Sequence, residues 1–505
     1  MRATKIGLSV AAVILGLTMT GYFLQAQSGA QNRGRDASSP AAYVVPALPE
    51  SDRAYGAIDG KHLHEYVDEQ VAISRRYRDQ GHPQFWGRII GTSGDTESAE
   101  WLLNKYKQIG LTETRIQPLD LLPQWMAQSW EVTAAGAGKA LPLTSAQPAY
   151  HTPGTQGEGL ELEAVYVGLG SEADFAGRDV RGKAVFVFGM MKPGPSAAQA
   201  GALKRAEEKG AAAIFSVEGL PGNMKYQSYP TNTNVPTFSL GTEDGEAVRN
   251  MIAQAMPGQA PHVRIRLDVQ LVPNLKTALV WGTLPGATDE TIYVIAHRDG
   301  WFDAAGDNAG GVAAMLGLAE YFAKVPKDQR RRTMVFIGTD GHHNTGPGVG
   351  AGREWLVAHR NQFFTKTAMM INCEHPSDVD TYPEMNTFAP LEWYAGGPSR
   401  PEMQEMAGSI FREFGVTTWA QPSKVPPGGD VGRFYWFVPG VVAQSNDFLY
   451  FHTDKNNAES VPWTGLEAVT RAYAKIVDQV NKIDLKDLQR PVGSDPRPPS
   501  SGTGQ

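Results

Sequence analysis

Histidine and carboxylate side chains stand at the ends of apolar segments in the second half of this 505-residue chain. The apolar run 292–295 has the composition of a buried parallel strand, and it stops at His297 and Asp299. A glycine-containing turn then brings Asp307 to the start of a helix whose apolar face is built by residues 312–322. Ionisable side chains therefore meet at the strand ends, where open α/β sheets bind ligands.

Later apolar segments end in the same way. The polar residues that follow them are His342 and His343 after residues 333–337, Glu374 and His375 after residues 367–371, and His452 after residues 440–444. Taken singly, His297 is expected to be a hydrogen-bonded edge histidine and Asp307 a helix cap. Imidazole nitrogens and carboxylate oxygens are, however, the usual protein ligands of zinc. The clustering of five histidines with Asp307 and Glu374 therefore predicts a metal site.

The alternation of such strands with amphipathic helices predicts an α/β fold with a mostly parallel central sheet flanked by helices. Helices are expected at residues 62–77 and from Asp95, as N-cap, to Gly110. An edge strand is expected at residues 113–119. Residues 125–271 change to short apolar strands between Gly, Pro and Asp turns, which predicts an inserted β-rich domain.

The N-terminus has the layout of a secretory signal peptide or of an uncleaved anchor. Arg2 and Lys5 precede an apolar run at residues 6–23. This predicts export to a periplasm or to the cell exterior, with membrane contact only through a retained anchor. The single cysteine, Cys373, excludes an intrachain disulfide. The predicted organisation is a leader at 1–30, a disordered spacer at 31–54, the main domain at 55–124 and 272–488, its insertion at 125–271, and a disordered tail at 489–505.

The formal net charge is −7, and the chain has no dense basic patch, which excludes nucleic acid as a partner. Its hydrophobic fraction of 41% and charged fraction of 20% are ordinary for a globular protein. The sequence specifies neither an oligomeric state nor a side-chain preference.

Together these features resemble the M28 family of zinc exopeptidases, over roughly residues 63–480. The resemblance rests on the motifs AHRD at 296–299, GDNAGG at 306–311, INCE at 371–374 and YFHT at 450–453, with GGDVGRF at 428–434 matching a structural segment. It implies an eight-stranded mixed sheet between helices, which holds two zinc ions bridged by one aspartate. Within the insertion, the strands at 184–188 and 211–215 and the helix between them resemble a protease-associated domain.

The resemblance also implies a role for each matching residue. One zinc would be held by His297, Asp307 and Glu374, and the other by Asp307, His343 and His452. Asp299 would contact His297 without binding zinc itself, and would orient its ring and fix its tautomer. His342 occupies the position of the general base, and the substrate would be a peptide.

The chain departs from the family pattern at the centre of this site. His342 and His343 stand where the family has two glutamates, Glu374 replaces the more usual aspartate, and Phe451 stands where a tyrosine often stabilises the oxyanion. Histidine is a good zinc ligand, so metal binding should survive. Two negative charges are lost, which weakens the second zinc site, and nearby zinc disfavours a protonated His342. The substitutions therefore predict slowed, altered or lost hydrolysis.

Three functions fit these observations. The first is an exported, zinc-dependent aminopeptidase, a metallopeptidase that removes N-terminal residues from peptides. The second is a catalytically silent binding protein that keeps the fold. The third is a single-zinc acyl transferase of the glutaminyl-cyclase type, because one fold supports several chemistries.

Overall fold

The computed structural model describes residues 48–189, 197–343, 351–378, 391–392, 401–416, 419–420, 430–435, 437–444 and 448–488. The predicted leader 1–30, most of the predicted spacer 31–54 and the predicted tail 489–505 lie outside these residues. Within the described ranges, no helix combines the length and the apolarity that a membrane crossing requires. Residues 1–53 and 54–505 form separate units, and the second unit holds all of the sheets.

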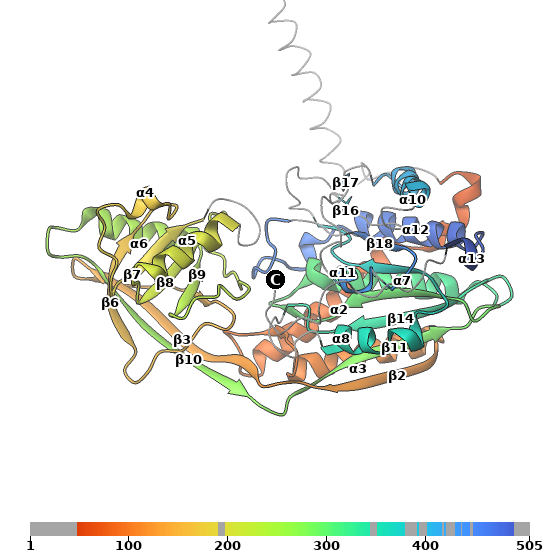
Figure 1. The fold of residues 1–505 in the computed structure, drawn as a ribbon, viewed down its shortest axis with the longest axis horizontal. Helices are drawn as coiled ribbons and strands as arrows, with labels where there is room; N and C mark the ends of the chain where they lie inside the picture. The colour runs from red at the N-terminus through yellow and green to blue at the C-terminus, as the bar shows by residue number, and fades with distance from the viewer. Residues whose placement is uncertain are drawn as a thin grey trace, which may run out of the picture. The chain divides into compact units, whose positions relative to one another are not determined.

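A six-stranded mixed sheet forms the centre of the larger unit (Figure 1). Its strand order is β18 (Val441–Gln444), β15 (Thr367–Cys373), β12 (Thr291–His297), β14 (Thr333–Thr339), β11 (Lys276–Leu284) and β2 (Thr112–Asp120). The first four strands run parallel, whereas β11 is antiparallel to both of its neighbours. The prediction of a mostly parallel sheet with β2 at its edge is confirmed. Among the described residues this sheet has six strands, not the eight that the resemblance implies.

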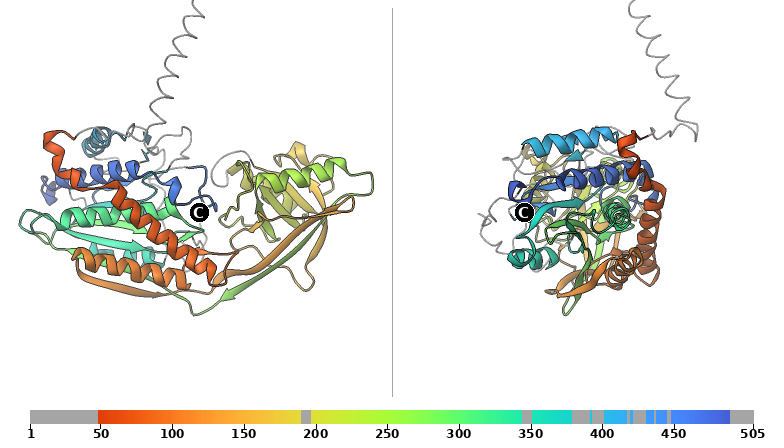
Figure 2. Two further views of the ribbon diagram at one scale, coloured as in Figure 1. Left: turned by 180° about the vertical axis from the view of Figure 1, so that it is seen from behind. Right: turned by 90° about the vertical axis from the view of Figure 1, so that its right-hand side faces the viewer.

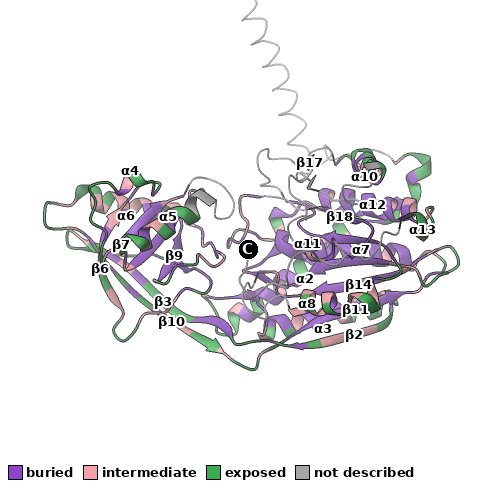
Figure 3. Cartoon of the chain, viewed as in Figure 1, coloured by how far each residue is buried: buried purple, intermediate pink, exposed green. Residues whose placement is uncertain are grey.

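Helices cover both faces of this sheet (Figures 1 and 2). One face carries α2 (Gly60–Asp79), α3 (Ser93–Ile109), α7 (Gly310–Ala323), α10 (Pro401–Glu413) and α12 (Trp463–Val480), and the other carries α8 (Ala351–Ala358), α9 (Arg360–Phe363) and α11 (Val431–Phe434). Side chains alternate along a strand, so Ile292 and Val294 of β12 pack in the α7 core while Tyr293 and Ile295 pack in the opposite core. The central strands are therefore buried along their length (Figure 3).

The segment between β2 and β11, which contains the predicted insertion at residues 125–271, forms a sheet of its own. The strand order is β4 (Lys139–Pro142), β3 (Gln124–Gly136), β10 (His262–Val272), β6 (Leu160–Tyr166), β7 (Ala184–Phe188), β8 (Ala213–Val217), β9 (Thr237–Leu240) and β5 (Gln147–Pro148), with helices α4 (Glu172–Phe175), α5 (Ala197–Glu208) and α6 (Thr242–Gln254). That this segment is a protease-associated domain stays a prediction.

Short elements complete the fold. They are η1 (Glu50–Ala57), β1 (Gly87–Arg88), β13 (Gly300–Trp301), η2 (Ala305–Ala309), β16 (Leu391–Glu392), β17 (Trp419–Ala420), η3 (Ala458–Ser460) and α13 (Leu485–Leu488). The element η1 corrects the predicted spacer, whose last residues are helical. The physical reason is Tyr55, which is 7% exposed and donates a hydrogen bond to Asp478 (Oη to Oδ2, 2.8 Å).

The N-cap of helix α3 lies three residues before the predicted one. Thr92 is the N-cap, and its Oγ1 accepts a hydrogen bond from the backbone N–H of Asp95 (3.4 Å). Asp95 instead lies inside the first turn, where its carboxylate forms an ion pair with Arg298. Gly110 ends the helix as predicted, because its φ of 91° lies in the left-handed region that glycine tolerates.

Asp95 and Arg298 are each 1% exposed, so this ion pair ties α3 to the turn after β12 inside the core. Removing one partner of a buried pair costs about 3–5 kcal/mol, because the other charge stays buried. We therefore expect Asp95→Ala to lower the free energy of unfolding by about 3 kcal/mol or more. Glu97→Ala is the control: it breaks a pair with Arg76 whose side chains are 41% and 50% exposed, which should cost about 1 kcal/mol or less. Urea unfolding followed by tryptophan fluorescence measures the free energy of unfolding of both variants. Equal losses of stability would contradict a buried, stabilising ion pair between Asp95 and Arg298.

Candidate metal centre

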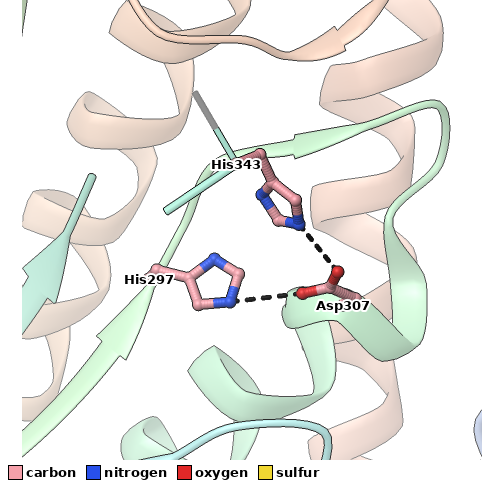
Figure 4. Close-up of side chains that lie close together, drawn as sticks. All are labelled: His297, Asp307 and His343. Carbon is pink, nitrogen blue, oxygen red and sulfur yellow. Dashed lines mark hydrogen bonds and ion pairs between the residues drawn. The ribbon is translucent and has the colours of Figure 1, made fainter. Parts of the chain in front are cut away.

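The carboxylate of Asp307 is surrounded by four imidazole rings, two of which are drawn in Figure 4. Its Oδ1 lies 3.2 Å from Nε2 of His297 and 2.8 Å from Nε2 of His375. Its Oδ2 lies 2.7 Å from Nε2 of His343 and 3.2 Å from Nε2 of His452. All five side chains are buried. Each carboxylate oxygen thus faces its own pair of histidines.

These residues come from the ends of the parallel strands, as the sequence predicts. His297 ends β12, His343 follows β14, Glu374 and His375 follow β15, His452 lies between β18 and α12, and Asp307 lies in η2 before α7. Segments that are far apart in sequence therefore converge at one edge of the sheet, which is where α/β sheets place their ligand sites.

Asn308 joins the strand ends to each other. Its Nδ2 donates to the carbonyl oxygens of Cys373 (3.0 Å) and His297 (3.4 Å). Its Oδ1 accepts from the backbone N–H groups of Gly311 (3.0 Å) and His375 (3.2 Å). One fully buried amide thus holds the ends of β12 and β15 against the start of α7.

Two further contacts hold the backbone of Asp307 and His452. The side-chain oxygen of Asn456 accepts hydrogen bonds from the N–H groups of Gly306 (2.9 Å) and Asp307 (3.3 Å). The N–H of Gln227 donates to the carbonyl oxygen of His452 (3.0 Å). Gln227 lies between β8 and β9, so the segment that forms the second sheet also contributes to this site.

Asp299 contacts two of the histidines, where the sequence predicts one. Its backbone carbonyl accepts from Nδ1 of His297 (3.2 Å), and its carboxylate oxygen Oδ1 lies 3.6 Å from the same nitrogen. Its Oδ2 accepts from the N–H of His343 (3.1 Å) and from Nδ1 of the same ring (3.2 Å). Both rings are therefore held at Nδ1, which turns Nε2 toward Asp307.

His342 lies beside the histidine cluster and does not contact Asp307. Its ring stacks on His297, with centroids 4.2 Å apart and an interplanar angle of 11°. Its Nδ1 donates to Oδ1 of Asp430 (2.8 Å), which also accepts from Nη1 of Arg353 (2.7 Å). Its Nε2 lies 3.4 Å from Oε1 of Glu374. The sequence places Asp430 only in a structural segment, so its contact with His342 is a site feature that sequence reasoning missed.

Aromatic rings enclose the centre. Phe451 stacks on His452, with centroids 3.7 Å apart, and lies 5.6 Å from His375. Trp301 and Tyr229 each lie 4.8 Å from the His452 ring, by centroids. Phe451 is thus within the site, as its position in the sequence predicts, and it brings no hydroxyl group there. Apolar walls of this kind exclude water and strengthen electrostatic interactions.

Burial and neighbouring charges shift the pKa values of the groups around Asp307. Burial would raise the pKa of the Asp307 carboxyl, but the charges of His343 and His375 hold it well below its usual range. Burial would lower the pKa of His343, but Asp307 and Asp299 outweigh this effect and raise it to about 9. Burial lowers the pKa of His452 to about 3. The carboxylates therefore favour a protonated ring at His343, whereas burial favours a neutral ring at His452.

The residues fit a metal ion. Among the described residues, His297 Nε2, Asp307 Oδ1 and His452 Nε2 are buried and make only the ion-pair contacts given above, and the buried Nδ1 of His452 has no hydrogen-bond partner. Such atoms are costly unless something binds them, and imidazole nitrogen and carboxylate oxygen are zinc ligands. Two sets have their ligand atoms within 4.8 Å of one another, namely His297, Asp307 and His343, and His297, Glu374 and His375.

The predicted ligands His297, Asp307, His343, Glu374 and His452 are therefore brought together by the fold. The sequence places His375 in the histidine cluster that predicts a metal site, but it assigns no ligand role to this residue. Its place in that cluster and its position next to Glu374 were the available signals.

Comparison with known proteins identifies related folds. Residues 280–477 match the model of peptidase family M28. The zinc aminopeptidase from Bacillus subtilis is 18% identical with a TM-score of 0.60, over 84% of this chain and 95% of that one. The aminopeptidase from Aneurinibacillus sp. strain AM-1 is 18% identical with a TM-score of 0.55, over 84% of this chain and 95% of that one. A peptidase M28 precursor from Shewanella amazonensis is 16% identical with a TM-score of 0.63, over 89% of this chain and 99% of that one. No curated protein sequence matches the chain. The structural matches show a shared fold, with central sheets and flanking helices.

Metal binding should release protons from this centre. The pKa of His343 is raised from 6.5 to about 9, so the metal-free ring is protonated near neutral pH, whereas a metal ligand must be neutral. The stability that this proton contributes is present below pH 6.5 and is lost as the pH rises through about 9. We expect calorimetric zinc titrations at about pH 7.5, in buffers of different ionisation enthalpy, to show at least one proton released per chain. Binding without proton release would contradict this description.

Proposed function

We propose that this chain is an exported, zinc-dependent exopeptidase that removes N-terminal residues from peptides. The match of residues 280–477 to the model of peptidase family M28 supports this proposal. The observation that carries the proposal is the buried Asp307 carboxylate, each of whose oxygens faces two imidazole nitrogens. A carboxylate in this setting is suited to bridging two metal ions. Export rests on the charged and apolar N-terminal layout, and the protease-associated assignment of residues 125–271 rests on their sequence resemblance.

The ligand sets follow from the two sides of Asp307. His297 and Glu374 would hold zinc on the Oδ1 side, and His343 and His452 would hold zinc on the Oδ2 side. When bound, zinc polarises the scissile carbonyl and lowers the pKa of the attacking water. The contacts of Asp299 keep His297 and His343 in the tautomer that presents Nε2 to the metal.

His342 is the proposed general base. Its Nδ1 proton is held by Asp430, so Nε2 is the atom that takes a proton from the attacking water. That nitrogen lies 3.4 Å from the carboxylate of Glu374, which places it at the edge of the metal centre. Proton transfer by a positioned side chain typically contributes about a hundred- to ten-thousand-fold to the rate.

Asp430 changes how well His342 can serve as a base at the position where the family has a glutamate. An imidazole that accepts a proton next to metal ions becomes a cation among cations, which opposes the transfer. The Asp430 carboxylate, 2.8 Å from Nδ1, offsets part of that charge. Arg353 shares the same carboxylate oxygen, so the compensation is partial. This arrangement supports a working but slower base than the glutamate that the family pattern implies.

We expect His342→Gln to lower kcat by about a hundredfold or more, with bound zinc unchanged, because the glutamine amide accepts no proton. Release of p-nitroaniline from aminoacyl anilides measures the activity, and elemental analysis measures the zinc. His262→Gln is the control, since His262 is an exposed residue of β10 outside the site. Unchanged hydrolysis in the His342 variant would assign the base to another residue.

The same assays separate the alternatives. A wild-type protein that binds zinc but hydrolyses none of the anilides would favour a silent binding protein. Cyclisation of N-terminal glutamine peptides with release of ammonia, in place of anilide hydrolysis, would favour an acyl transferase. Wild-type protein that binds no zinc would contradict all the metal-dependent functions.

A further inference from the structure

We propose that His375 is a metal ligand, which makes the centre imidazole-rich and selective for zinc, cobalt(II) and nickel(II) over manganese(II) and magnesium. The proposal rests on the proposed function, because it names the donor set and the class of metal at that same site. It gives a ligand role to His375, which the sequence places only in the histidine cluster and which the family pattern does not include.

The geometry places His375 on the Oδ1 side of Asp307. Its Nε2 lies 2.8 Å from Oδ1, and the residue is 4% exposed. His297 approaches the same oxygen at 3.2 Å. One ligand atom each from His297, Glu374 and His375 lie within 4.8 Å of one another. These distances are those of side chains that converge on a common point.

A backbone hydrogen bond and aromatic packing hold the His375 ring in this position. Its backbone N–H donates to Asn308 (3.2 Å), and its φ of 45° lies in the left-handed region. Phe448 and Phe451 meet its ring at steep angles, with centroids 5.5 and 5.6 Å away. A ligand fixed by packing and hydrogen bonding loses little freedom on binding, so its contribution to affinity is large.

Including His375 makes the two sides of Asp307 unequal. The Oδ1 side then has four protein donors, which are His297, His375, Glu374 and Asp307 itself. Among the described residues, the Oδ2 side has three, which are His343, His452 and Asp307. Four protein donors complete a tetrahedral zinc site, whereas three leave a position for water or substrate. The Oδ1 side should therefore bind zinc more tightly than the Oδ2 side.

The donor types determine the metal. Four of the six side chains around the centre offer imidazole nitrogen, which suits zinc, nickel and copper, whereas manganese and magnesium prefer oxygen. A centre built mainly from carboxylates would not discriminate in this way. Replacing His375 with an oxygen donor should therefore shift the preference toward manganese.

The test is a chelator-competition titration of metal-free protein, which resolves a tight and a weak zinc site. His375→Asn should weaken the tight site at least about tenfold, the order expected for disturbing a metal site, and leave the weak site within about twofold. His375→Asp should lower the ratio of zinc to manganese affinity by about tenfold or more. Asn and Asp are chosen because both tolerate a positive φ. His151→Asn is the matched control, because His151 also has a positive φ (66°) but is exposed and outside the site.

Equal zinc affinities at the tight site in wild type and His375→Asn would overturn the assignment of His375 as a ligand. Because the wild type would still bind zinc in that case, the proposed function would stand. A wild-type protein that binds no zinc would instead overturn the proposed function. A second measurement needs no variant: proton NMR of the cobalt(II)-substituted wild type should show four exchangeable, metal-shifted imidazole N–H signals. Three such signals would also overturn the assignment of His375.

Discussion

A buried carboxylate that meets four imidazole nitrogens is the interaction on which this structure depends. Asp307 is 3% exposed, and burial of an unpaired carboxylate is costly. In the metal-free chain the cost is offset by a proton on His343 and by the charge of His375, which together hold the pKa of Asp307 well below its usual range. The same arrangement leaves the buried Nδ1 of His452 without a hydrogen-bond partner among the described residues. A divalent metal would satisfy both demands at once.

The surrounding fold serves to keep these side chains together. The parallel strands bring their carboxyl ends to one edge, and the Asn308 amide links the ends of β12 and β15 to α7. Gln227, from the segment that forms the eight-stranded sheet, holds the carbonyl of His452. Arg88, which is fully buried, donates to the carbonyl oxygens of Arg298, Asp303 and Ala304 and so supports the turn that carries Asp299. The metal centre is therefore a product of both sheets.

The sequence predicted the parts of this site that depend on local pattern. Strands that end at His297 and before Glu374 could be recognised because buried parallel strands are continuous apolar runs. The predicted N-cap of α3 was wrong. Thr92 and Asp95 are both good capping residues, and only the ion pair of Asp95 with Arg298 decides between them. Asp430 was missed because it meets His342 across 88 residues of sequence. His375 was placed in the histidine cluster without a ligand role, because no sequence pattern reveals the left-handed backbone conformation at the end of β15.

The most direct test of this account is diffraction from zinc-soaked crystals, with data collected on both sides of the zinc absorption edge. Two anomalous peaks should flank the Asp307 carboxylate, one bound by His297, His375 and Glu374 and the other by His343 and His452. A peak on the His343 side alone, with His297 and His375 still in contact with Asp307, would contradict the two-sided centre. No peak within coordination distance of Asp307 would contradict the metal-dependent function itself.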